Sequence, residues 1–256
     1  MPQKIVYEQP LNERVRTLLR LEFLFLQVRH NLNGCALWDS RATLAGVFDI
    51  LNVCSRSDLK SDILKELERH AESLSQLEHT PGVDVARLNQ ILTELDALID
   101  RMHAMNGQPG QALRQNEFLN SIKQRSSIPG GLCDFDLPAY HYWSQRPVEQ
   151  RTRDLCDWLS TLEPLRLSVD LLLRLLRDCA MPTHELAGGG FFQKSLDAEN
   201  PSCQLVRVAV PNNAPYYAEI SGGKHRFTVR FMEPVPGGRA AQTAGDVEFD
   251  LTCCIL

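Results

Sequence analysis

The chain has 256 residues, 43% of them hydrophobic, which is enough to bury a core in one large domain or two unequal ones. Its formal net charge is -5 with a pI near 5.8, so the chain as a whole carries no basic field to attract nucleic acid or an anionic membrane. The longest apolar run, 21–26, is interrupted by Glu22 and is far shorter than the ~20 residues of a membrane span, and the first residues do not resemble a secretory signal. These features predict a cytoplasmic protein in which any basic contact surface is local.

The first predicted elements are a strand and two helices. The strand covers about 4–8 and ends at Pro10, after which Asn12 is placed to cap a helix that runs to about residue 30. A second helix is expected over about 40–54. The inward face of the first helix is predicted to contain Val15, Leu18, Leu19 and Leu26.

Two apolar stripes with alternating spacings of three and four predict a pair of helices between about 58 and 105. The first stripe consists of Ile63, Leu67, His70, Leu74 and Leu77, and the second of Val85, Leu88, Leu92, Leu95, Ile99 and Met102. Pro81 and Gly82 break the first helix, and Asp84 can cap the second. Helices joined by so short a loop lie antiparallel, so we expect an αα-hairpin arm, a shape suited to gripping another protein.

Three further helices and a loop are expected before residue 181. The helices cover about 111–125, 148–161 and 163–179, and the loop runs from 128 to 138. In this loop Leu132, Phe135 and Leu137 are predicted to pack into the core, and Asp136 to cap the next helix. Strand patterns follow at 205–210, 218–221, 226–232 and 246–253.

Strict alternation in two of these strands predicts which residues share a face. Arg226 and Arg230 lie on one face of their strand, and Glu248 and Asp250 lie outward on theirs, so antiparallel pairing of the two strands would bring the opposite charges together. The predicted fold class is α+β. A mainly α-helical domain over 11–180 contains the αα-hairpin arm, and a small antiparallel β-sheet domain covers 181–256, joined by the N-terminal strand 2–10.

The eight cysteines form no CxxC pair and match no zinc-site spacing, which is typical of reduced thiols in a cytosolic protein. Cys133 and His141 nevertheless offer the thiol and imidazole of a cysteine-dependent hydrolase or transferase. Zinc binding by Cys133, Cys253 and His141 would require the fold to gather them. The last four residues, 253–256, also fit a C-a-a-X prenylation box. Core packing explains these residues more simply, so no catalytic residue, cofactor or metal is predicted.

Basic side chains from separate segments form the other candidate site. They are Arg14, Arg16, Arg20, Arg114, Lys123, Arg125, His141, Lys224, Arg226 and Arg230. If folding gathers even half of them into one groove, an acidic protein acquires a local site for an acidic peptide. The alternative is that each is solvated or paired with Asp or Glu, and composition does not choose between the two.

Several blocks of the chain resemble the ZapD family of bacterial cell-division proteins. They are 7–13 (YEQPLNE), 16–17, 19–23, 64–69, 81–84, 127–138 (SIPGGLCDFDLP) with His141 and Trp143, 220–227, 230–232 and 249–254. These blocks occur in order over essentially the whole chain, and the block at 127–138 is the most specific. The resemblance implies a helical domain followed by a sheet domain, in agreement with the change of composition near residue 181.

The resemblance further implies a cytoplasmic, non-enzymatic homodimer at the mid-cell division ring. It would bind the C-terminal tail of the tubulin-like GTPase FtsZ and cross-link FtsZ filaments into bundles. The tail-binding surface of the family is basic, so Arg20 and His141 carry over first. Arg114 also carries over, but 115–117 (QNE) follows where the family pattern has a second basic residue, so that part of the groove is differently charged. The full predicted set is Arg16, Arg20, Arg114, His141, Lys224, Arg226 and Arg230. A helical scaffold for another acidic partner is the remaining alternative.

Overall fold

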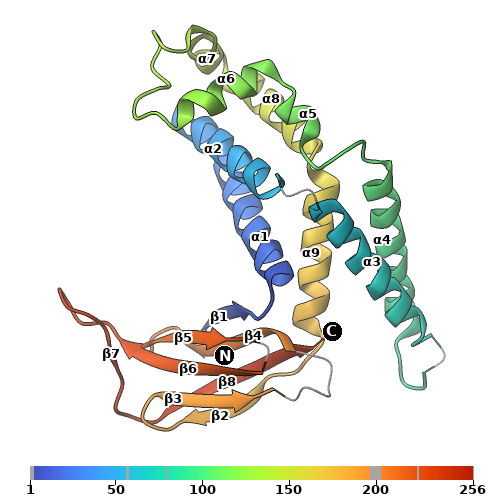
Figure 1. Cartoon of the computed structure of the whole chain (residues 1–256), viewed down its shortest axis with the longest axis vertical. Helices are drawn as coiled ribbons and strands as arrows, with labels where there is room; N and C mark the ends of the chain where they lie inside the picture. The colour runs from blue at the N-terminus through green and yellow to red at the C-terminus, as the bar shows by residue number, and fades with distance from the viewer. Residues whose placement is uncertain (1–2, 56–57, 79, 197–202, 224, 256) are drawn as a thin grey trace. The chain divides into compact units, whose positions relative to one another are not determined.

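The computed structural model describes residues 3–55, 58–78, 80–196, 203–223 and 225–255. Its contacts divide the chain into two compact units, a sheet unit (Met1–Leu18 with Leu173–Leu256) and a helical unit (Leu19–Leu172). The predicted α+β class is confirmed by helices in the first two thirds of the chain and antiparallel sheets in the last third (Figure 1). Within the described part of the chain, no helix has both the length and the apolar character that crossing a membrane requires.

The helices follow one another along the chain between β1 and β2 (Figure 1). They are α1 (Glu13–Leu32), α2 (Leu37–Val53), α3 (Leu59–Ser75), α4 (Val85–Ala104), α5 (Gln111–Arg114), α6 (Glu117–Ser126), α7 (Pro138–Ser144), α8 (Val148–Ser160) and α9 (Glu163–Asp178). Side-chain caps fix several of their starts. Asn12 Oδ1 accepts a hydrogen bond from Val15 N at 2.8 Å, and Asp84 Oδ1 accepts one from Arg87 N at 3.1 Å. Both caps were predicted.

The helix expected over 111–125 is instead two helices, α5 and α6. Asn116 has an extended backbone, and its side chain accepts a hydrogen bond from Leu119 N at 3.0 Å. A residue that caps the start of α6 cannot continue α5, so the helix is interrupted at Asn116. A helix was expected after Asp136, but no bounds were predicted for α7, because seven residues are too few to show a helical period.

The α3–α4 hairpin is confirmed, but the predicted stripe on α4 is partly wrong (Figure 1). The buried positions of α4 are Leu88, Leu95, Leu98 and Met102, whereas Val85 is 46% exposed. The spacings along this seam are seven, three and four, typical of two helices that pack along their length. On α1, Leu26 was predicted to face inward but is exposed, because Phe25 takes the inward position one residue earlier.

The strands form two sheets in which all neighbours are antiparallel. The first sheet has the order β1 (Lys4–Pro10), β4 (Cys203–Pro211), β8 (Val247–Ile255), β2 (Thr183–Ala187). The second has the order β3 (Phe191–Ser195), β6 (Arg226–Glu233), β5 (Tyr217–Gly222), and β7 (Ala241–Gln242) also pairs with β6. The short strands β2, β3 and β7 were not predicted.

The two sheets share one apolar core, to which Val208, Phe227, Phe231 and Phe249 contribute. The rings of Phe231 on β6 and Phe249 on β8 lie 5.1 Å apart between centroids. The predicted pairing of these two strands is therefore wrong, because they meet through their apolar faces and belong to different sheets. Alternation then directs their charged faces to opposite outer surfaces, so Arg226 and Arg230 do not face Glu248 and Asp250.

Candidate functional site

The seven residues of the predicted basic groove divide between the two units. Arg16, Arg226 and Arg230 belong to the sheet unit, and Arg20, Arg114 and His141 belong to the helical unit. Lys224 lies outside the described residues. The predicted set is therefore divided between the two units and does not belong to one of them.

In the sheet unit, Arg226 and Arg230 lie on the outer face of β6. The register places Arg226 opposite Ser195 of β3, and Arg230 opposite Phe191 of β3 and Glu219 of β5. Both arginines are exposed, and in the described part of the chain neither has a carboxylate oxygen within 4.0 Å. Two cations four residues apart on one strand are thus available to an external anion.

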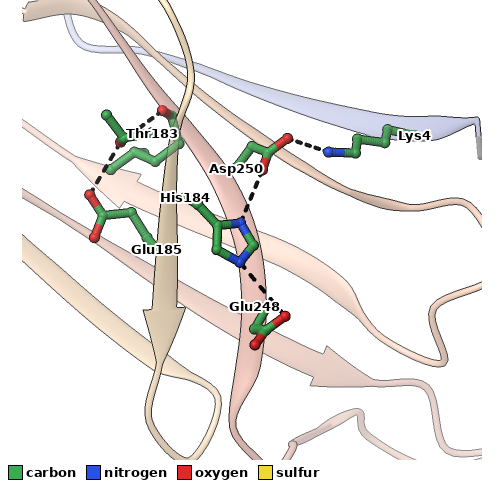
Figure 2. Close-up of polar contacts among 7 residues, drawn as sticks. Lys4, Thr183, His184, Glu185, Glu248 and Asp250 are labelled. Carbon is green, nitrogen blue, oxygen red and sulfur yellow. Dashed lines mark hydrogen bonds and ion pairs between the residues drawn. The ribbon is translucent and has the colours of Figure 1, made fainter. Parts of the chain in front are cut away.

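The acids that were expected to neutralise these arginines have other partners (Figure 2). His184 Nδ1 lies 3.3 Å from Asp250 Oδ1, and His184 Nε2 lies 3.6 Å from Glu248 Oε2. Lys4 Nζ donates to Asp250 Oδ2, and this hydrogen bond is the largest cause that lowers the pKa of the Asp250 carboxyl. Lys4, His184, Glu248 and Asp250 therefore form a cross-strand network on the outer face of the first sheet.

Arg16 and Arg20 lie one turn apart on α1, but their surroundings differ. Arg16 is half-buried, and its Nε lies 3.3 Å from Glu13 Oε1. Arg20 is exposed and has no ion pair among the residues that the structure describes. Of the two, Arg20 is the cation available to a partner.

Arg114, at the end of α5, is half-buried and already engaged. Its Nη2 donates a hydrogen bond to the backbone carbonyl of Leu51 at 3.2 Å, which links α5 to the end of α2. Burial raises the pKa of the nearby Cys54 thiol to about 12, although the charge of Arg114 acts in the opposite direction. Arg114 thus has a structural contact that sequence reasoning did not foresee.

His141 lies exposed on α7, after a loop that differs from the prediction. Phe135 was expected in the core but is 80% exposed, whereas Leu137 is buried as predicted. Asp136 does not cap α7, whose first residue is Pro138. The Asp136 carboxylate instead lies 3.6 Å from Arg125 Nη1. The chain turns here through backbone hydrogen bonds, such as Leu137 N to Cys133 O at 3.0 Å, which leave the Phe135 ring in solvent.

The thiol–imidazole pair required for cysteine-dependent catalysis is not formed among the described contacts. Cys133 and His141 are both exposed, and no hydrogen bond between their side chains occurs in the described residues. Those residues also contain no group of three or more His, Cys, Asp or Glu side chains arranged to hold a metal ion. Cys253, the third proposed zinc ligand, belongs to the sheet unit, whereas Cys133 and His141 belong to the helical unit.

An aromatic cluster next to His141 in sequence was missed. Phe118 of α6, Tyr140 and Trp143 of α7, and Trp158 of α8 pack with centroid separations of 6.0 Å from Trp143 to each of the other three rings. Trp143 Nε1 donates to Asp154 Oδ2 at 2.9 Å, which satisfies its polar atom. The spacing of three between Tyr140 and Trp143 was the available signal for a helix with one aromatic face.

This cluster borders an open pocket of about 390 Å³, here called the α7 pocket. The rings of Phe118, Tyr142, Trp143 and Trp158 line it, with Arg146 and Asp154 as its charged members. Tyr142 is 73% exposed. Arg146 Nη1 lies 3.6 Å from Asp154 Oδ2, so the two charges of the pocket are paired with each other. Exposed aromatic side chains of this kind are typical of surfaces that anchor an apolar side chain of a partner.

Comparison with known proteins identifies the family. The family model described as "ZapD: Cell division protein" matches residues 19–230. A "Cell division protein ZapD" from Methylococcus capsulatus is 46% identical over 256 residues, which cover all of both chains. The protein of the same name from Aromatoleum aromaticum is 42% identical over 254 residues, and that from Coxiella burnetii is 37% identical over 252 residues, each covering at least 97% of both chains. By this similarity, the chain belongs to the ZapD family of cell division proteins.

Proposed function

We propose that this protein binds the C-terminal tail of FtsZ through exposed basic side chains and, as a homodimer, bundles FtsZ filaments at the mid-cell division ring in the cytoplasm. One observation carries the binding proposal. Arg20, His141, Arg226 and Arg230 are all exposed, and in the described part of the chain none has a carboxylate oxygen within 4.0 Å. Basic side chains with no internal partner are available to an acidic peptide.

Bundling follows from binding if the protein has two-fold symmetry. Each homodimer would carry two equivalent tail sites, so one dimer could hold tails from two filaments. A filament displays many tails at high local concentration, and a modest affinity for one tail is therefore sufficient for stable cross-linking.

An exposed apolar stripe on α1 supports self-association. Phe23 is 67% exposed and Leu26 is 58% exposed, and they lie three residues apart on the same helical face. We expect Leu26→Glu to shift the protein from dimer to monomer in sedimentation equilibrium and to abolish bundling, while a single tail peptide still binds. Phe135→Glu, at another exposed aromatic position, should leave the dimer intact. A Leu26→Glu protein that remains dimeric would exclude this stripe as the interface.

The test of tail binding is charge reversal at Arg20. Arg20→Glu should reduce co-sedimentation with FtsZ filaments in the presence of GTP, and reduce the light scattering of bundles, without changing the circular dichroism spectrum. Binding by the unmodified protein should also weaken as salt rises, because exposed charges are screened over about 8 Å at physiological ionic strength.

Arg239→Glu is the matched control, since Arg239 is an exposed arginine outside the predicted set and the change in net charge is identical. It should leave co-sedimentation unchanged. Equal losses in both variants would attribute binding to overall charge rather than to a site, and no loss in either would contradict the proposal.

A further inference from the structure

Two thiols in the core of the sheet unit lie next to each other. Cys203 begins β4, and Cys253 lies in β8 opposite Val206. Residues three apart in a regular strand, such as Cys203 and Val206, face opposite sides. The register shift between Cys203 and Leu205 changes this parity, so Cys203 joins Val206 and Cys253 on the face that packs between the sheets. The two thiols lie within hydrogen-bonding reach of each other across the strands, and Cys203 Sγ has a second acceptor in the backbone carbonyl oxygen of Leu205 at 3.4 Å.

The two sulfur atoms have different surroundings. Cys203 is 7% exposed, whereas Cys253 is half-buried and can be reached from solvent. The hydrogen bond from Cys203 lowers the pKa of Cys253, burial acts in the opposite direction, and the positive charge of Lys194 on β3 lowers it again. Glu185 on β2 opposes this effect, but its carboxylate lies 3.8 Å from Lys194 Nζ and is partly neutralised. Donating that hydrogen bond, together with burial, raises the pKa of Cys203.

We propose that Cys203 and Cys253 form a peroxide-sensitive modification site, in which Cys253 is oxidised first and Cys203 then closes a reversible intramolecular disulfide. The arrangement matches what this chemistry requires, an accessible thiolate with a resolving thiol beside it. The site is separate from the exposed basic residues and does not depend on tail binding.

The reaction balances with hydrogen peroxide as the oxidant. The Cys253 thiolate attacks one peroxide oxygen, an S–O bond forms, the O–O bond breaks, and hydroxide leaves and takes up the proton that Cys253 released. Cys203 then loses its proton and attacks the sulfenic sulfur, so an S–S bond forms, the S–O bond breaks and water leaves. Two thiols lose two electrons in total, and peroxide is reduced to two waters. Thiol–disulfide exchange with an external dithiol reverses the change.

Cys254, the neighbouring residue in β8, provides an internal contrast. It is buried and lies on the other face of the strand, where its thiol contacts Cys179. Burial raises the pKa of Cys254 to about 12, so its thiolate is scarce at neutral pH. Cys254 should therefore react slowly even though it also has a thiol neighbour.

Peptide mapping of the full chain tests the proposal without any substitution. The reduced protein is treated with hydrogen peroxide, alkylated and cleaved with trypsin, which places Cys203 in 195–207, Cys179 in 178–194 and both Cys253 and Cys254 in 240–256. We expect 240–256 to be linked to 195–207, and the link to disappear after treatment with dithiothreitol. A link to 178–194, or a link that forms only between chains as protein concentration rises, would overturn the proposal.

Two variants separate the roles of the sulfurs. Cys203→Ser should stop the reaction at a sulfenic acid on Cys253 that dimedone traps, and Cys253→Ser should leave Cys203 reduced. Cys133→Ser, which removes an exposed thiol of the helical unit, is the control and should leave the link intact. In the unsubstituted protein, Cys253 should react with peroxide about tenfold faster than Cys133. Equal rates at these two cysteines would contradict the assigned order.

Discussion

In the sheet unit, Glu8 lies between two arginines, whereas in the helical unit Arg20 and His141 have no carboxylate oxygen within 4.0 Å among the described residues. Glu8 accepts hydrogen bonds from Arg177 Nη2 at 2.7 Å and from Arg207 Nε at 2.9 Å. Burial by itself would raise the pKa of Glu8, but the hydrogen bonds and charges of the two arginines outweigh it and lower the pKa. The ion pairs of Glu8 hold its strand and helix α9 together, whereas the exposed basic side chains of Arg20 and His141 are available to a partner.

The same contrast holds for two phenylalanines. Phe249 is 2% exposed and packs between the sheets, whereas Phe135 is 80% exposed in the loop before α7. One ring contributes to folding through the area it removes from water, and the other remains exposed to water in the folded chain. Substitutions at matched pairs of buried and exposed residues test this distinction.

The largest expected effect is that of Phe249→Ala. Removing a fully buried ring leaves a cavity and should lower the free energy of unfolding by about 3–5 kcal/mol, measured by urea denaturation. Phe135→Ala is the matched control and should change it by no more than about 0.5 kcal/mol. Similar losses in the two variants would mean that the loop ring is also part of the folded core.

A smaller loss is expected for Glu8→Gln, which leaves two half-buried guanidinium groups without their carboxylate. Because Glu8 retains 18% exposure, solvent relieves part of the penalty, and the loss should be about 1–3 kcal/mol. Glu13→Gln, at a carboxylate that is 70% exposed and pairs with Arg16, should cost less than about 0.5 kcal/mol in the same urea experiment. A Glu8→Gln protein as stable as the unmodified chain would contradict the assigned role of this cluster.

The difference in unfolding free energy between the unmodified protein and Glu8→Gln should change with pH in a direction that the pKa of Glu8 determines. The pKa of Glu8 is lower in the folded chain than its ordinary value of 4.5, so the unfolded state binds the proton more readily. The stabilisation by Glu8 is therefore fully present above pH 4.5 and is lost as pH falls through the folded pKa. Urea denaturation of both proteins from pH 7 to pH 3 should show the gap between unmodified protein and Glu8→Gln narrowing below pH 4.5. A gap that widens there would reverse the sign of the shift.

Tyr142→Ala tests whether the α7 pocket contributes to partner binding. This ring is 73% exposed and lines the pocket, so its removal should leave the urea midpoint unchanged. We expect the affinity for an FtsZ tail peptide, measured by fluorescence anisotropy, to fall about fivefold, the effect of an interface aromatic that is not a central anchor. An unchanged affinity would exclude this side of α7 from the tail site.

The smallest effect is expected in the exposed network of the first sheet. Asp250→Asn removes one charge from the contacts with Lys4 and His184 (Figure 2). Exposed pairs of this kind contribute little, so the free energy of unfolding should fall by about 0.5 kcal/mol or less. A loss comparable to that of Glu8→Gln would show that this surface is covered by something in solution.

Local features of the fold could be predicted from the sequence, and long-range ones could not. The caps at Asn12 and Asp84 depend on neighbouring backbone groups, and the α3–α4 hairpin depends on one short loop, so both were found. Alternation correctly placed Arg226 and Arg230 on one face of their strand and Glu248 and Asp250 on the outer face of theirs. A period of two, however, does not say which strand lies beside which. Two strands with buried faces can pair edge to edge or pack face to face, and β6 and β8 pack face to face.

The candidate site was predictable only as a list of residue types. Residues Arg16, Arg20 and Arg114 are the same residue type, but the partners of each guanidinium group depend on which residues the fold brings near it. Arg16 lies beside Glu13, Arg114 donates to the carbonyl of Leu51, and Arg20 remains exposed. Phe135 in the loop before α7 is a second example. It is an apolar residue between two acids, and this pattern does not show whether the backbone turns will direct its ring into the core or into solvent.

The affinity of the Arg20→Glu variant for the tail peptide decides whether exposed basic side chains without an internal partner receive the FtsZ tail. Fluorescence anisotropy at low salt should show at least about a tenfold loss, equivalent to about 1.4 kcal/mol of binding free energy, with a weaker dependence on salt than in the unmodified protein. Equal affinity and equal salt dependence in the two proteins would contradict the account.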